Sequence, residues 1–310
     1  MSAVISTPLI DPALDPGLPR RLFGYDVIDL IGQGAGSLIY VVSQPGSKQV
    51  FALKHVVRKT AKDERFIEQL ETEYEIGRQV SHPGLRRSIE LKANRTLLRR
   101  VTEATLIMEL FDGIPLEQQL PRHLTDMVAT FIQTAQALAA LNAMGYVHCD
   151  LKPNNILRDS SGQVKVIDLG QAARNGTVKK RIQGTPDFMA PEQVKCLPVT
   201  FRTDVYNLGA TMYWALSGRK MPTLFTIRKS QNSFLVDDQL ATPRDINPMV
   251  PEPLSNLVME CVRTNPTKRP ADMVELSRRL EVIEHSLQRR VQSSFVAESE
   301  YRGNANIRIA

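Results

Sequence analysis

The sequence is poor in cysteine and lacks a long, uninterrupted apolar run. Cys149, Cys196 and Cys261 lie far apart in 310 residues, which argues against a disulfide framework or a zinc site and fits a reducing compartment. The most apolar stretches, 128–141 and 205–216, carry polar side chains or are too short to span about 30 Å of hydrocarbon. Because the N-terminus has no charged start followed by an apolar run, we expect a cytoplasmic protein with no membrane partner.

Blocks of charge of one sign are also lacking. The net charge is +6 and the pI about 9.3, but the basic residues are scattered in short runs such as Lys179–Arg181. Short basic runs of this kind usually form a solvated face. We therefore expect no nucleic-acid partner, although a mildly basic chain suits a small anion such as a nucleotide.

Two kinds of pattern divide the chain. Residues 1–22 are rich in proline without an apolar periodicity, which predicts a mobile N-terminal leader. Residues 23–108 favour short strands, among them Tyr25–Ile31, Ser37–Ser43 and Val50–Val56, with one helix at Asp63–Val80. This half is therefore predicted to be a small β-rich lobe.

The remainder is predicted to be mainly helical. After a connection at 109–113, residues 114–285 contain long apolar-faced segments at 125–144, 203–216, Pro251–Arg263 and Ala271–His285. Two brief β-branched runs, Ile156–Arg158 and Val164–Ile167, are too short for helices. Residues 286–310 form a polar C-terminal tail, into which we expect the last helix to continue before it frays. The fold class predicted is α+β, with a β-rich lobe followed by a larger helical lobe.

A glycine-rich turn lies between two of the predicted strands. Gly32, Gly34 and Gly36 occur within Ile31–Tyr40, and glycines allow the backbone to approach phosphate groups closely. Such a turn alone most often marks only a tight hairpin. A dinucleotide-binding fingerprint is disfavoured, because that motif must open a helix and residues 38–42 have the character of a strand.

A lysine and a glutamate in the first half form a predicted ion pair. Lys54 ends an apolar strand, where a cation is costly to bury without an anionic partner. In the helix that follows, apolar residues lie three and seven positions on either side of Glu73, which places this carboxylate within the apolar stripe. Each group therefore needs the other.

The most informative run is Val147–Leu157, on a loop that leaves the first long helix of the second half. Asp150 can accept a proton from a hydroxyl group, Lys152 can contact a transferring phosphoryl group, and Asn155 can hold a metal ion. Asp168 follows at the end of a short strand. Each aspartate alone could simply cap a turn, but chance is a poor explanation for these groups at this spacing, after a glycine-rich turn and a lysine on a strand.

With these motifs in place, the chain resembles the eukaryotic-type (Hanks-type) serine/threonine protein kinase family, and in particular its compact bacterial members. The resemblance runs from about 23 to 285. It rests on the glycine-rich turn, 51–54 (FALK), 148–155 (HCDLKPNN), 168–170 (DLG), 184–192 (GTPDFMAPE), 204–209 (DVYNLG) and Lys268–Pro270. The last segment supplies Arg269, the arginine that in relatives pairs with the glutamate found here as Glu192.

The resemblance implies a bilobal protein kinase domain at 23–285 that transfers the γ-phosphoryl group of ATP, with Mg²⁺, to Ser or Thr hydroxyls of proteins, including its own. Asp150 and Lys152 would be catalytic, Asn155 and Asp168 would hold the metal, and a protein substrate would dock near Gly184–Glu192. The implied nucleotide-binding residues are Ile31, Gly32, Gln33, Gly34, Ala35, Gly36, Ser37, Ile39, Ala52, Lys54, Glu73, Met108, Glu109, Phe111 and Leu157. Thr185 is placed to hydrogen-bond Asp150 and Lys152.

Two departures from the family pattern bear on regulation. Cys149 stands where relatives usually have an arginine that receives an activation-loop phosphate. The loop from Gln171 to Gln183 is short, and Thr177 carries its only hydroxyl. We therefore predict that activity does not depend on phosphorylation of this loop.

Two other functions remain open at this stage. A pseudokinase, an ATP-binding scaffold without catalysis, would normally have lost one of the reactive groups, and none is lost here. A small-molecule kinase would share the nucleotide residues, but the GTPDFMAPE segment at 184–192 is typical of a shelf for a protein substrate. Neither the substrate nor the oligomeric state follows from the sequence.

Overall fold

The computed structural model describes residues 18–34, 36–97, 99–222 and 240–306, with side chains to Arg289. The chain folds as two compact units. The first unit runs to Tyr74 and includes Ser88–Leu110, whereas the second comprises Glu75–Arg87 and the chain from Phe111 onward. Each is described below by itself.

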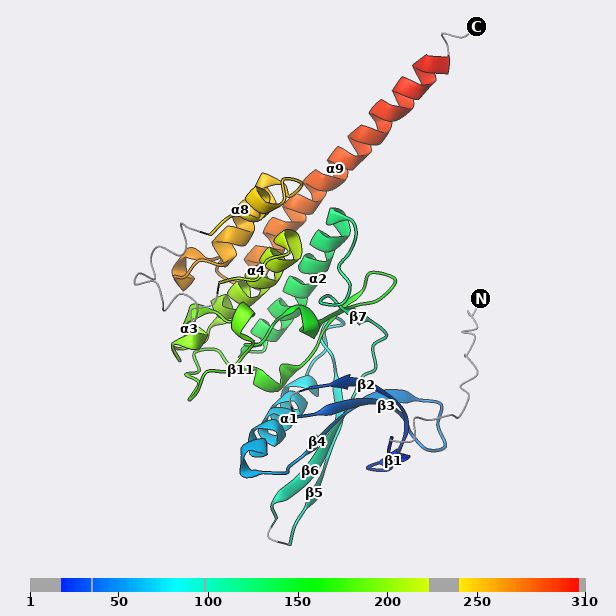
Figure 1. The fold of residues 1–310 in the computed structure, drawn as a ribbon, viewed down its shortest axis with the longest axis vertical. Coiled ribbons are helices and arrows are strands. Elements are labelled where there is room, and N and C mark those ends of the chain that lie inside the picture. The colour runs from blue at the N-terminus through cyan, green and yellow to red at the C-terminus, as the bar shows by residue number, and fades with distance from the viewer. Residues whose placement is uncertain (1–17, 35, 98, 223–239, 307–310) are drawn as a thin grey trace. The chain divides into compact units, whose positions relative to one another are not determined.

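The first unit is built on a six-stranded antiparallel sheet. Its strand order is β1-β2-β3-β4-β6-β5. The strands are β1 (Arg21–Leu22), β2 (Tyr25–Gln33), β3 (Leu38–Ser43), β4 (Val50–Val57), β5 (Ser88–Arg95) and β6 (Val101–Met108). The β2–β3 hairpin carries the glycine-rich turn, and Figure 1 shows these two strands beside each other.

Both faces of this sheet are buried near its centre, because side chains alternate along a strand. On β4, Leu53 joins a cluster with Tyr40, Val42 and Ile107. Its neighbour Ala52 points to the other face, where α1 (Glu64–Gly77) contributes Ile67 and Leu70 to a second cluster with Leu106 and Met108. The helix that carries Glu73 is thereby packed on the face of β4 that carries Ala52.

The second unit has one large helical core. Its helices are α2 (Leu124–Ala143), α3 (Pro191–Val194), α4 (Phe201–Ser217), α7 (Pro243–Ile246), α8 (Glu252–Cys261) and α9 (Met273–Asn306). Apolar residues of α2, α4, α8 and α9, including Phe131, Leu208, Leu257 and Leu280, are fully buried together. Figure 1 shows α9 continuing well past the other helices of this unit.

Short strands shape the loops of the second unit. β7 (Ile114–Pro115), β9 (Ile156–Arg158) and β10 (Val164–Val166) form a sheet of order β10-β9-β7, and β8 (Tyr146–Val147) pairs with β11 (Ala173–Arg174). The loop that begins with His148 therefore starts at β8 in one small sheet and leads to β9 in the other. This fixes both ends of the segment that carries Asp150.

The predicted α+β class is confirmed, and the helices and strands named from the sequence are present. Their ends differ by up to three residues, except that the last helix, α9, runs beyond the named end at His285. One feature differs from the prediction. Arg21–Leu22, the end of the predicted leader, forms β1 through pairing with Asp26 and Tyr25, and Leu18 packs on the cluster around Tyr40. As expected, the last helix continues into the polar tail, and α9 ends at Asn306.

The earlier part of the leader, residues 1–17, lies outside the described residues. The predicted limits of the lobes and of the domain stay predictions. In the part of the chain described, no helix combines the length and the apolar character needed to cross a membrane.

Candidate active site

The glycine-rich turn closes the β2–β3 hairpin of the first unit. The Gly34 N–H donates to the Ser37 carbonyl at 2.8 Å, and Gly32 pairs with Ile39 across the hairpin. The backbone of Gly36 lies against the ring of Phe66 on α1, so close that a Cβ at this position would fall 2.4 Å from the ring. Of the predicted loop residues, Ala35 lies outside the described part of the chain.

Lys54 and Glu73 form the ion pair predicted from the sequence. The Lys54 Nζ atom lies 2.7 Å from Glu73 Oε2, and the two side chains are 13% and 3% exposed. The helix is further tied to the sheet through Ser88, whose hydroxyl donates to the Glu73 carbonyl at 3.1 Å. A buried pair of this kind is costly to break, because either partner alone would be a buried unpaired charge.

Three other predicted nucleotide residues share the sheet face of Lys54. Ile39 is the direct cross-strand partner of Lys54, while Ala52 lies two positions before it and pairs with Met108. Side chains at such positions point to the same face. Ile31, Gln33 and Glu109 also belong to the first unit, and Phe111 and Leu157 to the second.

Asp204 of α4 holds the loop that carries Asp150 in place. The carboxylate of Asp204 accepts from the backbone N–H groups of His148 at 2.9 Å and Cys149 at 3.0 Å, and from Asn142 at 3.3 Å. Cys149 adopts a left-handed backbone conformation with φ of 67°, which is unfavourable for a non-glycine residue and persists only where the surroundings enforce it. Asp204 supplies that constraint.

Asp150 lies at the centre of a polar cluster. Lys152 Nζ is 3.3 Å from its Oδ2 atom and also donates to Thr185 Oγ1 at 2.8 Å, while the Thr185 hydroxyl donates to Asp150 Oδ1 at 3.2 Å. The hydrogen bonds predicted for Thr185 are thus confirmed. Burial raises the pKa of Asp150, whereas the Lys152 ammonium lowers it and the Asp168 carboxylate raises it.

Three further residues that the sequence did not indicate hold this cluster. Gln171 donates to Asp150 Oδ2 at 3.0 Å, and Lys179 in turn donates to the Gln171 carbonyl. Gln193 on α3 donates to the Cys149 carbonyl at 2.6 Å. Gln171 and Gln193 lie 21 and 44 positions from their partners, and Lys179, 8 positions from Gln171, reaches Asp150 only through that residue, so no local pattern in the sequence could have identified them.

Asn155 and Asp168 provide the chemistry of a magnesium site. The amide nitrogen of Asn155 donates to the Asp150 carbonyl at 2.8 Å, which leaves its amide oxygen as the ligand atom. The Ile167 N–H donates to the Asn155 carbonyl at 3.0 Å and so links this residue to the segment of Asp168. Among the described residues, no three His, Cys, Asp or Glu side chains gather as in an all-protein metal site. An ion held here would complete its shell with phosphate and water oxygens, as Mg²⁺ does.

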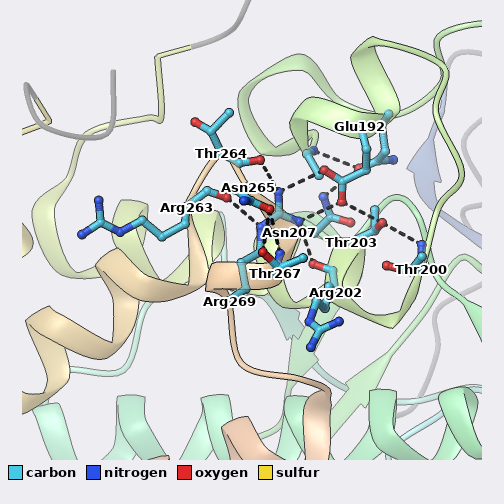
Figure 2. Close-up of polar contacts among 12 residues, drawn as sticks. Glu192, Thr200, Arg202, Thr203, Asn207, Arg263, Thr264, Asn265, Thr267 and Arg269 are labelled. Carbon is cyan, nitrogen blue, oxygen red and sulfur yellow. Dashed lines mark hydrogen bonds and ion pairs between the residues drawn. The ribbon is translucent and has the colours of Figure 1, made fainter. Parts of the chain in front are cut away.

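The predicted substrate segment, Gly184–Glu192, is anchored at its end. Figure 2 shows the carboxylate of Glu192 facing the guanidinium of Arg269, with Nη1–Oε1 and Nη2–Oε2 distances of 2.8 and 3.0 Å. Thr203 of α4 donates to Oε1 at 2.9 Å. The pairing of Glu192 with Arg269 implied by the resemblance is confirmed.

Cys149, which stands where relatives usually have a phosphate-binding arginine, lies in an apolar environment. Cys149 is 1% exposed and packs with Val147 and Val199, while Ala173 and Phe201 cover the same cluster. Burial raises the pKa of its thiol, so the group is uncharged near neutral pH. The loop from Gln171 is held here by the β8–β11 pairing and by the Gly176–Val199 and Val199–Thr177 backbone hydrogen bonds.

Comparison with known families agrees with this geometry. Residues 25–286 match the family described as "Protein kinase domain". The chain belongs to the protein kinase family. The family resemblance read from the motifs is thus confirmed, and the predicted Hanks-type, bacterial-like affiliation agrees with the relatives below.

Curated relatives of this kinase domain carry the name serine/threonine-protein kinase. PkaA of Streptomyces coelicolor is 31% identical over 280 residues, which cover 87% of this chain and 49% of the relative. PknA of Mycobacterium tuberculosis is 34% identical over 180 residues, with 54% and 41% covered. PknD of Chlamydia abortus is 26% identical over 279 residues, with 79% and 29% covered. The chain therefore spans half of these relatives' length or less.

Proposed function

We propose that this kinase domain transfers the γ-phosphoryl group of ATP to Ser and Thr hydroxyls of proteins, its own among them. The observation that carries the proposal is the polar cluster around Asp150. A carboxylate held by Lys152, Thr185 and Gln171 is a base of fixed orientation. Catalysis of phosphoryl transfer rests mainly on such positioning and on electrostatic stabilisation.

On this proposal the groups of the second unit act on the acceptor. Asp150 Oδ accepts the proton of the attacking hydroxyl, and Lys152 stabilises the negative charge that develops on the transferring phosphoryl oxygens. Thr185 holds both side chains, since its hydroxyl contacts each of them. The acceptor would be a Ser or Thr of a protein bound along Gly184–Glu192.

The groups of the first unit bind the nucleotide. Lys54, oriented by Glu73, contacts the α- and β-phosphates, and the glycine-rich turn offers backbone N–H groups to the same chain of phosphates. Ile39, Ala52 and Met108 provide an apolar face for the adenine ring. Mg²⁺, held by Asn155 and Asp168, would neutralise charge on the β- and γ-phosphate oxygens.

A scaffold that binds ATP without catalysis is the alternative. It is disfavoured because each group that the chemistry needs is present and because Lys54 and Asp150 both have the partners that orient them. Nothing in the chemistry of these groups requires a scaffold role.

The test is radiolabelled autophosphorylation of the chain with Mg²⁺–ATP. We expect label on serine or threonine of the wild-type protein and a loss of about a hundredfold or more in Asp150→Ala, since a positioned base contributes about 10²–10⁴ to the rate. The matched control is Asp26→Ala, which removes an exposed carboxylate paired only with the exposed Arg21 among the contacts described.

Two results would contradict the proposal. Equal labelling of wild type and Asp150→Ala would mean that Asp150 is not the base. Nucleotide binding by the wild-type protein without label on itself or on any protein would favour the scaffold. Chelation of Mg²⁺ is expected to abolish labelling in both the wild type and the Asp26→Ala control.

A further inference from the structure

The loop between Lys179 and Thr185 is tied to Asp150 at both of its ends. At one end, Lys179 donates to the carbonyl of Gln171, whose side chain donates to Asp150 Oδ2 at 3.0 Å. At the other end, the Thr185 hydroxyl donates to Asp150 Oδ1 at 3.2 Å. The five residues between these two anchors, 180–184, therefore start and end close to the base at which an acceptor hydroxyl would lie.

The segment 180–184 is positively charged, and no acidic side chain among the described residues pairs with its cations. Lys180 and Arg181 are exposed, and within the part of the chain that the structure describes neither takes part in an ion pair. From Gln171 to Pro186 the sequence contains four cationic residues, Arg174, Lys179, Lys180 and Arg181, and no acidic one.

The nearest acidic residues that follow are already engaged. Asp187 lies 2.8 Å from Lys220, and Glu192 is buried on Arg269. Lys195, a little further on, is a third exposed cation without an ion pair among the described residues. Among the described residues, Lys180, Arg181 and Lys195 thus leave a positive field that a bound substrate would compensate.

We propose that this kinase domain selects protein substrates with acidic residues next to the acceptor Ser or Thr, and that Lys180 and Arg181 are the residues that recognise them. The inference rests on the proposed function. The anionic neighbour of the acceptor can be an Asp or Glu side chain or a phosphorylated residue, because either offers oxygen acceptors to Lys and Arg. Ile182, 45% exposed between these cations and Thr185, offers an apolar contact beside them.

The test compares peptides of equal length with one central serine and flanking Glu, flanking Gln, flanking Lys or a flanking phosphoserine. We expect the full chain to phosphorylate the Glu peptide with a kcat/KM about fivefold to tenfold above that of the Gln peptide, chiefly through KM, because each of two exposed ion pairs contributes modestly. The preference should shrink as salt is added. The kcat/KM of the phosphoserine peptide, compared with that of the Glu peptide, shows whether a phosphorylated residue or an acidic side chain is the better neighbour of the acceptor.

The decisive variant is Lys180→Glu combined with Arg181→Glu, which should bring the Glu-to-Gln ratio to one or below and raise the rate on the Lys peptide. Arg99→Glu combined with Arg100→Glu reverses an equally exposed pair at the end of the β5–β6 hairpin, and it should leave the ratio unchanged. An acidic preference that survives the first reversal, or a wild-type preference for the Gln or Lys peptide, overturns the inference. If no peptide is phosphorylated and no Asp150-dependent autophosphorylation occurs, the proposed function itself has failed.

Discussion

Arg269 meets Glu192 through two parallel hydrogen bonds, of 2.8 and 3.0 Å, although 77 residues separate them in the sequence. The guanidinium is 0% exposed and the carboxylate 6%. Arg269 also donates to the carbonyls of Arg202, Arg263 and Thr264 (Figure 2). One guanidinium thus joins the end of the segment Gly184–Glu192 to α4 and to the loop after α8.

Because this pair is buried, removing one partner should be strongly destabilising. Arg269→Met leaves a buried carboxylate without its cation, and we expect a loss of about 3–5 kcal/mol in the free energy of unfolding, measured by urea denaturation. The matched control is Arg279→Met: Arg279 lies 2.6 Å from Glu260, but both side chains are more than a third exposed, so the loss should be about 1 kcal/mol or less. Equal losses in the two variants would show that burial does not set the strength of the Glu192 pair.

Because Gly36 contacts Phe66, a substitution of Phe66 on the helix should compensate for a substitution of Gly36 in the glycine-rich turn. Gly36→Ala would place a Cβ 2.4 Å from the Phe66 ring, which should displace the glycine-rich turn and raise KM for ATP by roughly tenfold, since overpacking costs about 1–3 kcal/mol. Phe66→Ala in the same chain should restore most of the loss.

Gly34→Ala is the control for this cycle, because its Cβ would meet the Ser37 hydroxyl at 3.0 Å and not Phe66. Phe66→Ala should give it no rescue. If the effects of Gly36→Ala and Phe66→Ala on KM simply multiply, the turn and the helix are not coupled through this contact.

The predicted independence from loop phosphorylation can be tested at Thr177. Its N–H and carbonyl bond to the backbones of Arg174 and Val199, contacts that alanine keeps, so Thr177→Ala should retain activity within about twofold. Thr185→Ala is the contrast, since it removes hydrogen bonds to two charged groups and should lower kcat/KM about tenfold or more. A large loss in Thr177→Ala would mean that its hydroxyl is needed.

The pH dependence of activity should report the environment of Asp150. The group must be ionised to accept a proton, so activity falls as the pH drops through its pKa. Burial raises that pKa, and the acidic limb of kcat/KM should therefore lie at higher pH than for an ordinary aspartate. The Lys152 ammonium lowers the pKa of Asp150. Lys152→Met removes this ammonium, so the variant should raise the pKa of Asp150 and move the acidic limb to still higher pH. A limb that stays in place would show that another group limits the rate at low pH.

Much of the fold could be predicted because local patterns reflect local forces. The strands Tyr25–Ile31 and Val50–Val56 are short β-branched runs, and the helix with Glu73 has a continuous apolar stripe. The stripe also located the ion pair, since a carboxylate on a buried face requires a cation. The strand β1 was missed because two residues carry no periodicity, and its pairing depends on the turn at Phe23–Gly24.

The residues that hold Asp150 could not be predicted for a different reason. Gln171 and Gln193 are polar side chains in two short helical turns and Lys179 lies in a loop, and nothing in their neighbours distinguishes them from solvated residues. Their roles arise only when segments far apart in the sequence meet. Short motifs identified the chemical groups, whereas the contacts that orient those groups depend on the tertiary fold.

The hydrogen bonds from His148 and Cys149 to Asp204 link catalysis to the cooperativity of folding. Asp204 is 0% exposed and belongs to α4, a helix whose side chains lie in the main core. The amides of His148 and Cys149 can exchange with solvent only when that core opens. The loop that carries Asp150 should therefore exchange its hydrogens as slowly as the core, although it is a loop. On the proposed function, substitutions that loosen α4 should impair phosphoryl transfer before the protein unfolds.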